Sequence, residues 1–235
     1  MIPAYNEAAV IGATLEAVDA YARAKGVGYE IVVVDDGSTD RTREVVGAVA
    51  AQRSAVRLLA APHGGKGAAV RAGMLDARGT WILFMDADHA TRIEQFDRFE
   101  PMLRDGAAVV IGSRRIPGAA IRRHQPRLRE TLGRGFTRLS NLIVGVDVPD
   151  FTCGFKCFEQ AAARRIFALQ RLTGWGFDAE ILFIAQRLGY RIAQVPVTWA
   201  DAGATRVRLG RDVLGSLREL LTIRVGWLCG WYPRP

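Results

Sequence analysis

The chain has 235 residues, of which 49% are hydrophobic and 24% charged, so it is long enough to bury one large core. Its formal charge of +8 predicts an anionic partner, such as nucleic acid, a membrane surface or a phosphorylated ligand. Three cysteines without the spacing of a zinc site favour a reducing compartment. No apolar run reaches the roughly 18 residues of a membrane span, and no secretory leader is recognisable. We therefore expect a protein that is neither exported nor inserted across a membrane.

The first half of the sequence alternates short apolar runs with amphipathic patterns. The apolar runs have the length of strands covered on both faces of a parallel sheet, and they span residues 29–34, 81–85 and 107–111. Apolar residues recur at helical spacing over residues 10–25, 39–51, 66–77 and 92–103. This alternation predicts a doubly wound α/β fold with a mostly parallel sheet and helices on both faces. Only two residues precede Pro3, so the expected first strand is either a stub or begins before the given sequence.

The regular pattern stops at residue 112. Eight arginines and one acid lie between residues 114 and 138. We predict a mobile loop over 115–129 that becomes ordered over anionic substrates, because burying so many unpaired guanidinium groups is costly. Helical spacing returns at 132–144 and 177–188, and residues 191–199 alternate like a late strand.

The last segment has the pattern of an amphipathic helix. We predict one domain over 1–210 and a C-terminal helix within 211–235 that lies on a membrane surface. Its apolar face would consist of Val213, Leu217, Leu220, Leu221, Val225, Trp227 and Leu228. Its positive charge would come from Arg211, Arg218 and Arg224. The alternative is a last helix packed on the domain.

Acidic side chains directly follow two predicted strands. Ligands of such sheets bind at the carboxyl ends of the strands. Asp36, in the motif DDGSTD, could accept hydrogen bonds from a nucleobase or a ribose, although the same motif also suits a turn with a helix cap. Asp86 and Asp88 follow the strand at 81–85, and two carboxylates so placed suit Mg²⁺ or Mn²⁺ shared with a diphosphate. The same spacing also occurs in surface turns.

Two further motifs precede predicted helices. Lys66 lies in a glycine-rich turn that suits an anion or is simply flexible. Neither the P-loop nor the dinucleotide-binding fingerprint is present. Asp178 and Glu180 begin a helical segment, where one could serve as a general base or orient an acceptor. The alternative for these two acids is a favourable interaction with the helix dipole.

Seven segments occur together in one order: IPAYNEA, VVDDGSTD, GGKGAAV, DADHAT, GSR, CGFK and WGFDAEIL. In this combination the chain resembles family 2 glycosyltransferases, in particular the branch of dolichyl-phosphate β-glucosyltransferase-like and polyprenyl-phosphate sugar transferases. The resemblance covers nearly the whole chain and implies a fold of the GT-A type. One departure is His89, which stands where a glycine is expected after the second aspartate.

The resemblance also implies roles for individual residues. Donor-binding residues are expected at Pro3, Tyr5, Glu7, Val34, Asp36, Lys66, Asp86, Ala87, Asp88 and Arg114. The metal, Mg²⁺ or Mn²⁺, is expected on Asp86 and Asp88. Catalytic roles are expected for Asp88, Arg114, Asp178 and Glu180, and acceptor-phosphate contacts for Arg127, Arg129 and Lys156.

The implied reaction is the inverting transfer of glucose from UDP-glucose to a dolichyl or polyprenyl phosphate, by an enzyme bound peripherally to the cytoplasmic face of a membrane. A phosphate acceptor is already ionised near neutral pH, so a strong general base is unnecessary. A GDP-mannose donor, or a glycan or protein acceptor, is the alternative within the family. A non-catalytic basic module that binds membrane or nucleic acid is the alternative outside it. We predict no nucleic-acid partner, because Phe136 is the lone aromatic residue in the basic stretch.

Overall fold

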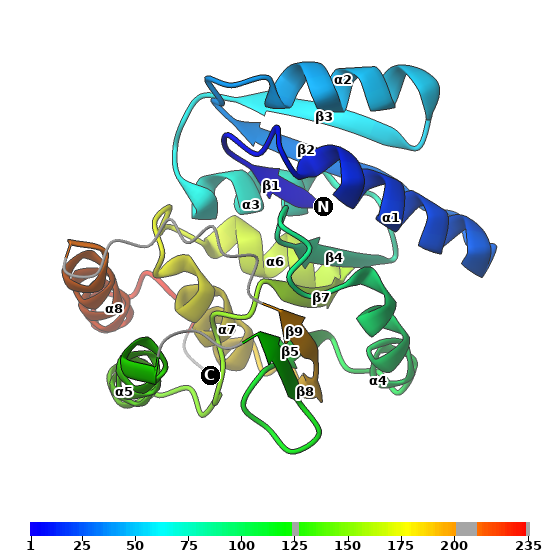
Figure 1. Ribbon diagram of the computed structural model, residues 1–235. Coiled ribbons are helices and arrows are strands. Elements are labelled where there is room, and N and C mark those ends of the chain that lie inside the picture. Colours follow the sequence, from blue (N-terminus) through cyan, green and yellow to red (C-terminus); the bar gives the residue numbers. More distant parts are fainter. Residues whose placement is uncertain (124–126, 201–210, 234–235) are drawn as a thin grey trace.

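The computed structural model describes residues 1–123, 127–200 and 211–233 (Figure 1). The strands are β1 (Ile2–Ala4), β2 (Ile31–Asp36), β3 (Val56–Ala61), β4 (Trp81–Met85), β5 (Val109–Ser113), β6 (Ala120–Arg123), β7 (Phe155–Glu159), β8 (Ile192–Pro196) and β9 (Thr198–Ala200). The helices are α1 (Ile11–Lys25), α2 (Thr42–Gln52), α3 (Lys66–Asp76), the 3₁₀ helix η1 (Ile93–Arg98), α4 (Glu100–Arg104), α5 (Arg127–Val144), α6 (Gln160–Leu169), α7 (Phe177–Arg187) and α8 (Arg211–Leu228).

The main sheet is mostly parallel. β2 lies between β1 and β3 and is parallel to both. The next strands follow in the order β4, β7, β5, β8, where β7 is antiparallel to its two neighbours and β8 is parallel to β5. The Met85 N–H donates to the Met1 carbonyl at 3.1 Å, so β4 continues beside β1 (Figure 1). The predicted fold class is confirmed, and β3 and β7 are additional to the predicted strands.

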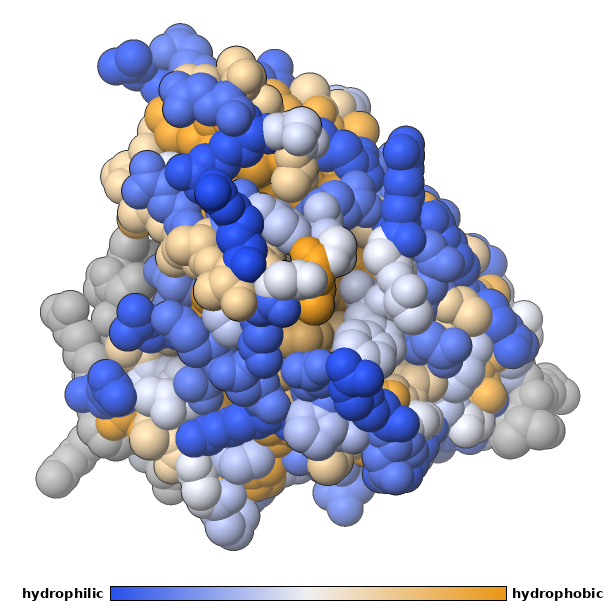
Figure 2. Space-filling view, turned by 90° about the vertical axis from the view of Figure 1, so that its right-hand side faces the viewer, coloured by the Kyte–Doolittle hydropathy of each residue, from blue (hydrophilic) through white to orange (hydrophobic). Residues whose placement is uncertain are grey.

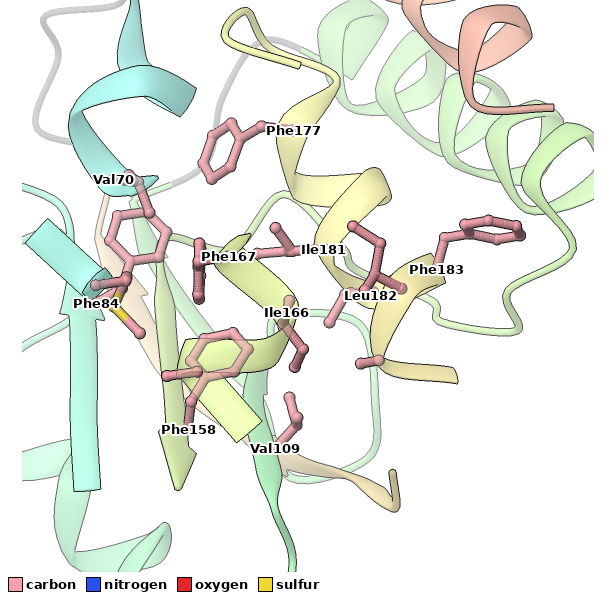
Figure 3. Close-up of a cluster of buried hydrophobic side chains, with 14 of the residues drawn as sticks. Val70, Phe84, Val109, Phe158, Ile166, Phe167, Phe177, Ile181, Leu182 and Phe183 are labelled. Atoms are coloured by element: carbon pink, nitrogen blue, oxygen red, sulfur yellow. The ribbon is translucent and has the colours of Figure 1, made fainter. Parts of the chain in front are cut away.

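The alternation of side chains along the strands explains why helices cover both faces of the sheet. In β2, Val32 and Val34 belong to one core cluster and Val33 to another, because successive side chains point to opposite faces. The first cluster packs with α3, α6 and α7, and its aromatic part includes Phe84 and Phe177, which meet edge to face (Figure 3). The second cluster packs with α1, α2, η1 and α4.

The loop predicted over 115–129 contains regular structure in its described part, and its ordering over substrates remains a prediction. β6 pairs in parallel with β9, and α5 begins at Arg127. The Arg115 guanidinium donates to Thr137 Oγ1 at 2.5 Å and to the Pro149 carbonyl at 3.2 Å. The cost that motivated the prediction does not arise here, because this guanidinium has hydrogen-bond partners.

Helix α8 has apolar residues on its buried side and on its exposed side. It packs against α5 and α7, and its Leu220 and Ile223 are buried. Leu221, Val225 and Leu228 are exposed. The packed alternative therefore holds for one side of the helix, which includes Leu220 of the predicted apolar face, and three residues of that face are exposed on the other side. The side chains of Arg211 and Val213 lie outside the described residues.

Exposed hydrophobic side chains are distributed unevenly over the surface. Figure 2 shows hydrophilic side chains over most of the face on the α1 and α4 side, with hydrophobic ones in small groups. Most of the exposed large hydrophobic residues of the described chain lie instead on α5, on α8 and just after α8: Leu139, Leu142, Leu221, Val225, Leu228 and Trp231. In the part of the chain that the structure describes, no helix has the length and apolar character to cross a bilayer.

Candidate active site

The loops that follow β1 and β2 are tied to each other. Asn6 has a φ of +55°, and its side-chain oxygen accepts the Thr39 N–H at 2.8 Å. The Glu7 N–H donates to Thr42 Oγ1 at 2.8 Å. Asp40 accepts the Thr42 N–H, so the capping alternative also holds for part of DDGSTD. These hydrogen bonds join the two motifs into one surface at the carboxyl ends of β1 and β2. A ligand of this kind of sheet is expected there.

A third loop, after β3, closes on Asp36. The Asp36 carboxylate accepts the N–H of Gly64 at 2.7 Å and that of Gly65 at 3.0 Å. His63 Nδ1 lies 2.9 Å from the same carboxylate, and its ring stacks on Tyr5 with centroids 4.4 Å apart. The predicted donor residues Tyr5 and Asp36 are therefore brought together, although Asp36 is occupied by this loop.

The Asp86–Ala87–Asp88 turn is fixed from two sides. Ala87 is buried, and its carbonyl accepts the Thr14 hydroxyl at 2.7 Å. The Asp86 N–H donates to the Gly154 carbonyl at 3.0 Å. A Cβ on Gly154 would lie 1.9 Å from Asp86 Oδ2, so only glycine leaves room for this carboxylate. Asp86 is half-buried and Asp88 is exposed, which leaves two carboxylates at the end of β4.

His89 keeps the backbone shape that the missing glycine would have. Its φ is +54°, in the left-handed region that favours glycine. The ring Nε2 accepts the Ile93 N–H at 3.0 Å at the start of η1. Burial lowers the pKa of His89 and so favours the neutral ring that can accept this bond. The departure from the family pattern therefore leaves the turn beside Asp88 in place.

The two acids fit a hard divalent cation that is shared with substrate. Carboxylate oxygens are suitable ligands for Mg²⁺ and Mn²⁺. Within the described ranges, no three His, Cys, Asp or Glu side chains are grouped closely enough to hold an ion. An ion on Asp86 and Asp88 would therefore take further ligands from water and from a diphosphate. The choice between Mg²⁺ and Mn²⁺ remains a prediction.

Lys66, the first residue of α3, lies beside these acids. Its Nζ is 2.7 Å from Asp86 Oδ1. It is also 5.6 Å from the ring centroids of Phe84 and of Trp175, which is itself partly exposed. Burial alone would lower the pKa of Lys66, but Asp86 and Asp178 outweigh it and the pKa is raised. The ammonium group therefore stays charged at the place where a diphosphate is expected.

Asp178 is close enough to Lys66 to favour its charged form, but Lys156 is not positioned to meet an acceptor phosphate. The Lys156 side chain is fully buried, and its Nζ lies 2.7 Å from the Cys153 carbonyl oxygen and 2.5 Å from Asp178 Oδ1. Burial raises the pKa of Asp178, against the opposing effects of Lys156 and Lys66. The expected acceptor contact of Lys156 is therefore corrected to an internal ion pair.

The Glu180 carboxylate is buried and bonded inside the protein. Its carboxylate accepts the Tyr232 hydroxyl at 2.6 Å and the N–H groups of Arg171 at 3.0 Å and Leu172 at 2.8 Å. Burial raises the pKa of Glu180 despite these three donors. Because its oxygens are occupied inside the protein, the structure does not support the catalytic role expected for Glu180. It braces the loop before α7.

The same loop is held from two further sides. Glu219 of α8 accepts the Gly176 N–H at 2.6 Å, directly before α7 begins. On the opposite side, the Gly67 N–H of α3 donates to the Thr173 carbonyl at 2.8 Å. The loop that carries Trp175 is thus fixed between α8 and the helix of Lys66.

Arg114 forms an internal pair. Its Nε and Nη2 groups each lie 2.7 Å from one oxygen of Asp150, and Nη2 also donates to Thr152. Burial opposes the charged form, but Asp150 outweighs it and the pKa of Arg114 is raised. A direct contact between this guanidinium and substrate would have to compete with a bidentate carboxylate. The side chains of Arg127 and Arg129 lie outside the described residues, so their role remains a prediction.

Two expected donor residues belong to the sheet itself. Pro3 and Val34 are buried partners in β1 and β2, so their side chains support the sheet beneath the loops instead of lining a pocket. Sequence reasoning also missed Thr14, Asp150 and Glu219. Each of them acts through a bond to a residue 36 to 73 positions away, and the sequence carries no local signal for such a pairing.

Comparison with known families agrees with this geometry. The model of the family described as "Glycosyl transferase family 2" matches residues 1–167. The chain belongs to glycosyltransferase family 2. The matched part includes every strand-end motif from β1 to β4 and the CGFK segment.

Curated relatives of this family 2 glycosyltransferase extend over nearly all of it. A dolichyl-phosphate β-glucosyltransferase of Trichomonas vaginalis, ALG5C, is 38% identical over 98% of this chain and 71% of its own length. The dolichyl-phosphate β-glucosyltransferase of Saccharomyces cerevisiae is 33% identical over 99% of the chain and 75% of its own. The human enzyme of the same name is 31% identical over 98% of this chain and 75% of its own length.

Solved structures confirm the GT-A fold. Mannosyl-3-phosphoglycerate synthase from Rubrobacter xylanophilus has a TM-score of 0.70 at 18% identity, over 97% of this chain and 72% of that one. Glucosyl-3-phosphoglycerate synthase from Mycobacterium tuberculosis, crystallised with Mn²⁺, UDP-glucose and phosphoglyceric acid, has a TM-score of 0.68 at 22% identity, over 95% and 78%.

Proposed function

We propose that this glycosyltransferase moves glucose from UDP-glucose to a dolichyl or polyprenyl phosphate with inversion at the sugar. The observation that carries the proposal is the match, over nearly the whole chain, to relatives named dolichyl-phosphate β-glucosyltransferases. The arrangement of Asp86, Asp88 and Lys66 beside the loops of Tyr5 and Asp36 suits a nucleoside diphosphate sugar. The uridine base and the divalent metal are finer parts of the same proposal.

Different residues at the strand ends are proposed to bind different parts of the donor. The base and ribose are proposed to lie against the Tyr5 and Asp36 loops, and the diphosphate between Lys66 and the Asp86 and Asp88 pair. A bound Mg²⁺ or Mn²⁺ would neutralise charge on the departing diphosphate. Lys66 adds a fixed positive charge next to Asp86 at the same place.

The acceptor needs placement more than deprotonation. A phosphate oxygen of the lipid attacks C1 of the glucose, the bond from C1 to the UDP oxygen breaks, and UDP leaves with its electron pair. Since a phosphate monoester is largely dianionic near pH 7, the attacking oxygen needs no strong base. We therefore assign Asp178 to orienting Lys66 and the acceptor.

A donor screen tests the proposal. The purified protein is incubated with UDP-glucose or GDP-mannose, a polyprenyl phosphate and Mn²⁺ or Mg²⁺, and lipid-linked sugar is measured. We expect a glucosylated lipid from UDP-glucose, and tighter binding of UDP than of GDP by calorimetry. Transfer from GDP-mannose alone would move the enzyme to the mannosyl alternative. Transfer to glycans or proteins without lipid would contradict the acceptor.

A lipid acceptor requires the protein to reach a membrane, and we propose that α5 and α8 provide the contact at the cytoplasmic face. Leu139 and Leu142 are exposed on α5, and Leu221, Val225 and Leu228 are exposed on α8. Arg218 and Arg224 lie on exposed positions of α8, and they can meet anionic headgroups. The two helices pack side by side.

Vesicle flotation tests the membrane contact. The double variant Leu221→Glu and Val225→Glu should lose most binding to vesicles that contain anionic lipid, because it places charge in the apolar surface. Val27→Glu is the matched control, since Val27 is also exposed but lies after α1. Flotation that does not depend on anionic lipid, and that is equal for the wild type, the double variant and Val27→Glu, would contradict the proposed surface.

A further inference from the structure

Lys156 occupies a position in the sheet that normally belongs to a hydrophobic residue. It lies in the central strand β7, paired with Phe84 on one side and Ile111 on the other. Phe84 and Ile111 belong to the same apolar cluster, and the Lys156 side chain is fully buried. Removing an ammonium group from water is costly unless the group is well paired, and a hydrophobic residue there would avoid this cost.

The partners of Lys156 explain how the charge is kept there. Nζ donates to the Cys153 carbonyl at 2.7 Å and to Asp178 Oδ1 at 2.5 Å. Cys153 precedes Gly154, whose carbonyl accepts the Asp86 N–H. The ammonium group of Lys156 therefore links the first turn of α7 to the Cys153–Gly154 segment, which is bonded to the Asp86–Ala87–Asp88 turn.

The charged groups around Asp178 form an alternating series. Asp178 contacts Lys156 of β7, and its negative charge is also stabilised by Lys66 of α3 and opposed by Asp86 at the end of β4. Lys66 in turn contacts Asp86 at 2.7 Å. The ring of Phe84 lies beneath both lysines, with its centroid 5.6 Å from one Nζ and 5.5 Å from the other.

We propose that Lys156 is a positioning residue whose ion pair fixes the Asp178 carboxylate in the charged cluster of Lys66 and Asp86 at the transfer site. This rests on the proposed function, in which Asp178 orients Lys66 and the acceptor. Without Lys156, the buried Asp178 carboxyl favours its neutral form, because burial already raises its pKa and one of two opposing cations is gone. Lys66 then loses one of the acids that stabilise its charge, and Asp86 and Asp88 remain.

Kinetics of two variants test the role. Lys156→Met should lower kcat about a hundredfold, because a small displacement of a reacting group has effects of this size, while KM for the donor changes little. The acidic limb of its pH profile should move to higher pH. Lys156→Arg should recover a large part of kcat. Arg164→Met is the control, since Arg164 also donates to a backbone carbonyl, that of Ala77, but lies on α6.

A stability measurement separates this role from the proposed function. Lys156→Met alone should lower Tm, and adding Asp178→Asn should restore part of the loss, because the double variant leaves no unpaired buried charge. Additive losses would overturn the pairing whatever the enzyme transfers. A lower kcat with an unshifted pH profile and no recovery in Lys156→Arg would overturn the positioning role. A wild-type enzyme that glucosylates no polyprenyl phosphate would instead contradict the proposed function, and the Tm comparison would still test the pair.

Discussion

The loops that we propose as the donor side of the site use charge differently from the region of Arg114, Asp150, Lys156 and Asp178, which we propose as the acceptor side. On the donor side, the loops after β1, β2 and β3 are joined largely by bonds to backbone N–H groups, and Asp88 is exposed. On the acceptor side, Arg114 with Asp150 and Lys156 with Asp178 form pairs inside the protein. The donor side thus presents acids to an incoming ligand, and the acceptor side uses its charges to fix its own shape.

Removal of an exposed acid should affect activity without affecting the fold. We expect Asp88→Ala to reduce transfer about a thousandfold or more, because several kcal/mol of charge stabilisation on the leaving diphosphate depend on it. Its Tm should match that of the wild type, and a chelator should reduce wild-type activity to a similar level. Full activity of Asp88→Ala in the presence of chelator would show that the donor side does not work through a metal.

Removal of a paired acid on the acceptor side should affect the fold first. Asp150→Asn keeps the shape but leaves the Arg114 guanidinium without its counter-ion, so we expect a loss of about 3 kcal/mol in the free energy of unfolding. Denaturant titration measures it. Asp105→Asn, in the exposed pair with Arg191, is the control and should be close to neutral. Normal stability with lost activity in Asp150→Asn would mean that Arg114 contacts substrate after all.

The smallest expected effect concerns Glu180 and pH. Burial raises its folded pKa above the ordinary value of 4.5. The folded state therefore holds this proton more tightly, and the stabilisation is complete below pH 4.5 and is lost as pH rises through the folded pKa. Thermal melts between pH 4 and pH 8 should show a shallower decline for Glu180→Gln than for wild type. Identical slopes would mean that Glu180 does not contribute to the pH dependence.

The donor side was largely predictable from sequence because its functional residues come directly after strands along the chain. The run predicted at 29–34 corresponds to β2, the run at 81–85 is β4, and the helix predicted at 66–77 is α3. Motifs at the ends of parallel strands meet at one edge of the sheet as a consequence of that topology. The positions of Asp36, Lys66, Asp86 and Asp88 therefore followed once the strands were assigned.

The acceptor side was less predictable because its pairs join distant segments. Arg114 and Asp150 are 36 residues apart, and Lys156 and Asp178 are 22 apart. β7 was not predicted from FKCFE, since a lysine in the middle of a strand is not expected to be buried. The arginine-rich stretch predicts a loop only if each guanidinium is unpaired, whereas Arg115 donates to Thr137 of α5 and to the Pro149 carbonyl.

The contacts of Glu219 and Tyr232 set the order in which the site can form during synthesis. The loops of Tyr5, Asp36 and Asp86 emerge early and can bond to one another as β1 to β4 assemble. The loop before Asp178 obtains its bonds from Glu219 and, through Glu180, from Tyr232 only when those residues have left the ribosome. A nascent chain can therefore have a nearly complete donor side before the loop ahead of α7 is braced, so the transferase gains its full set of contacts only near the end of translation of this region.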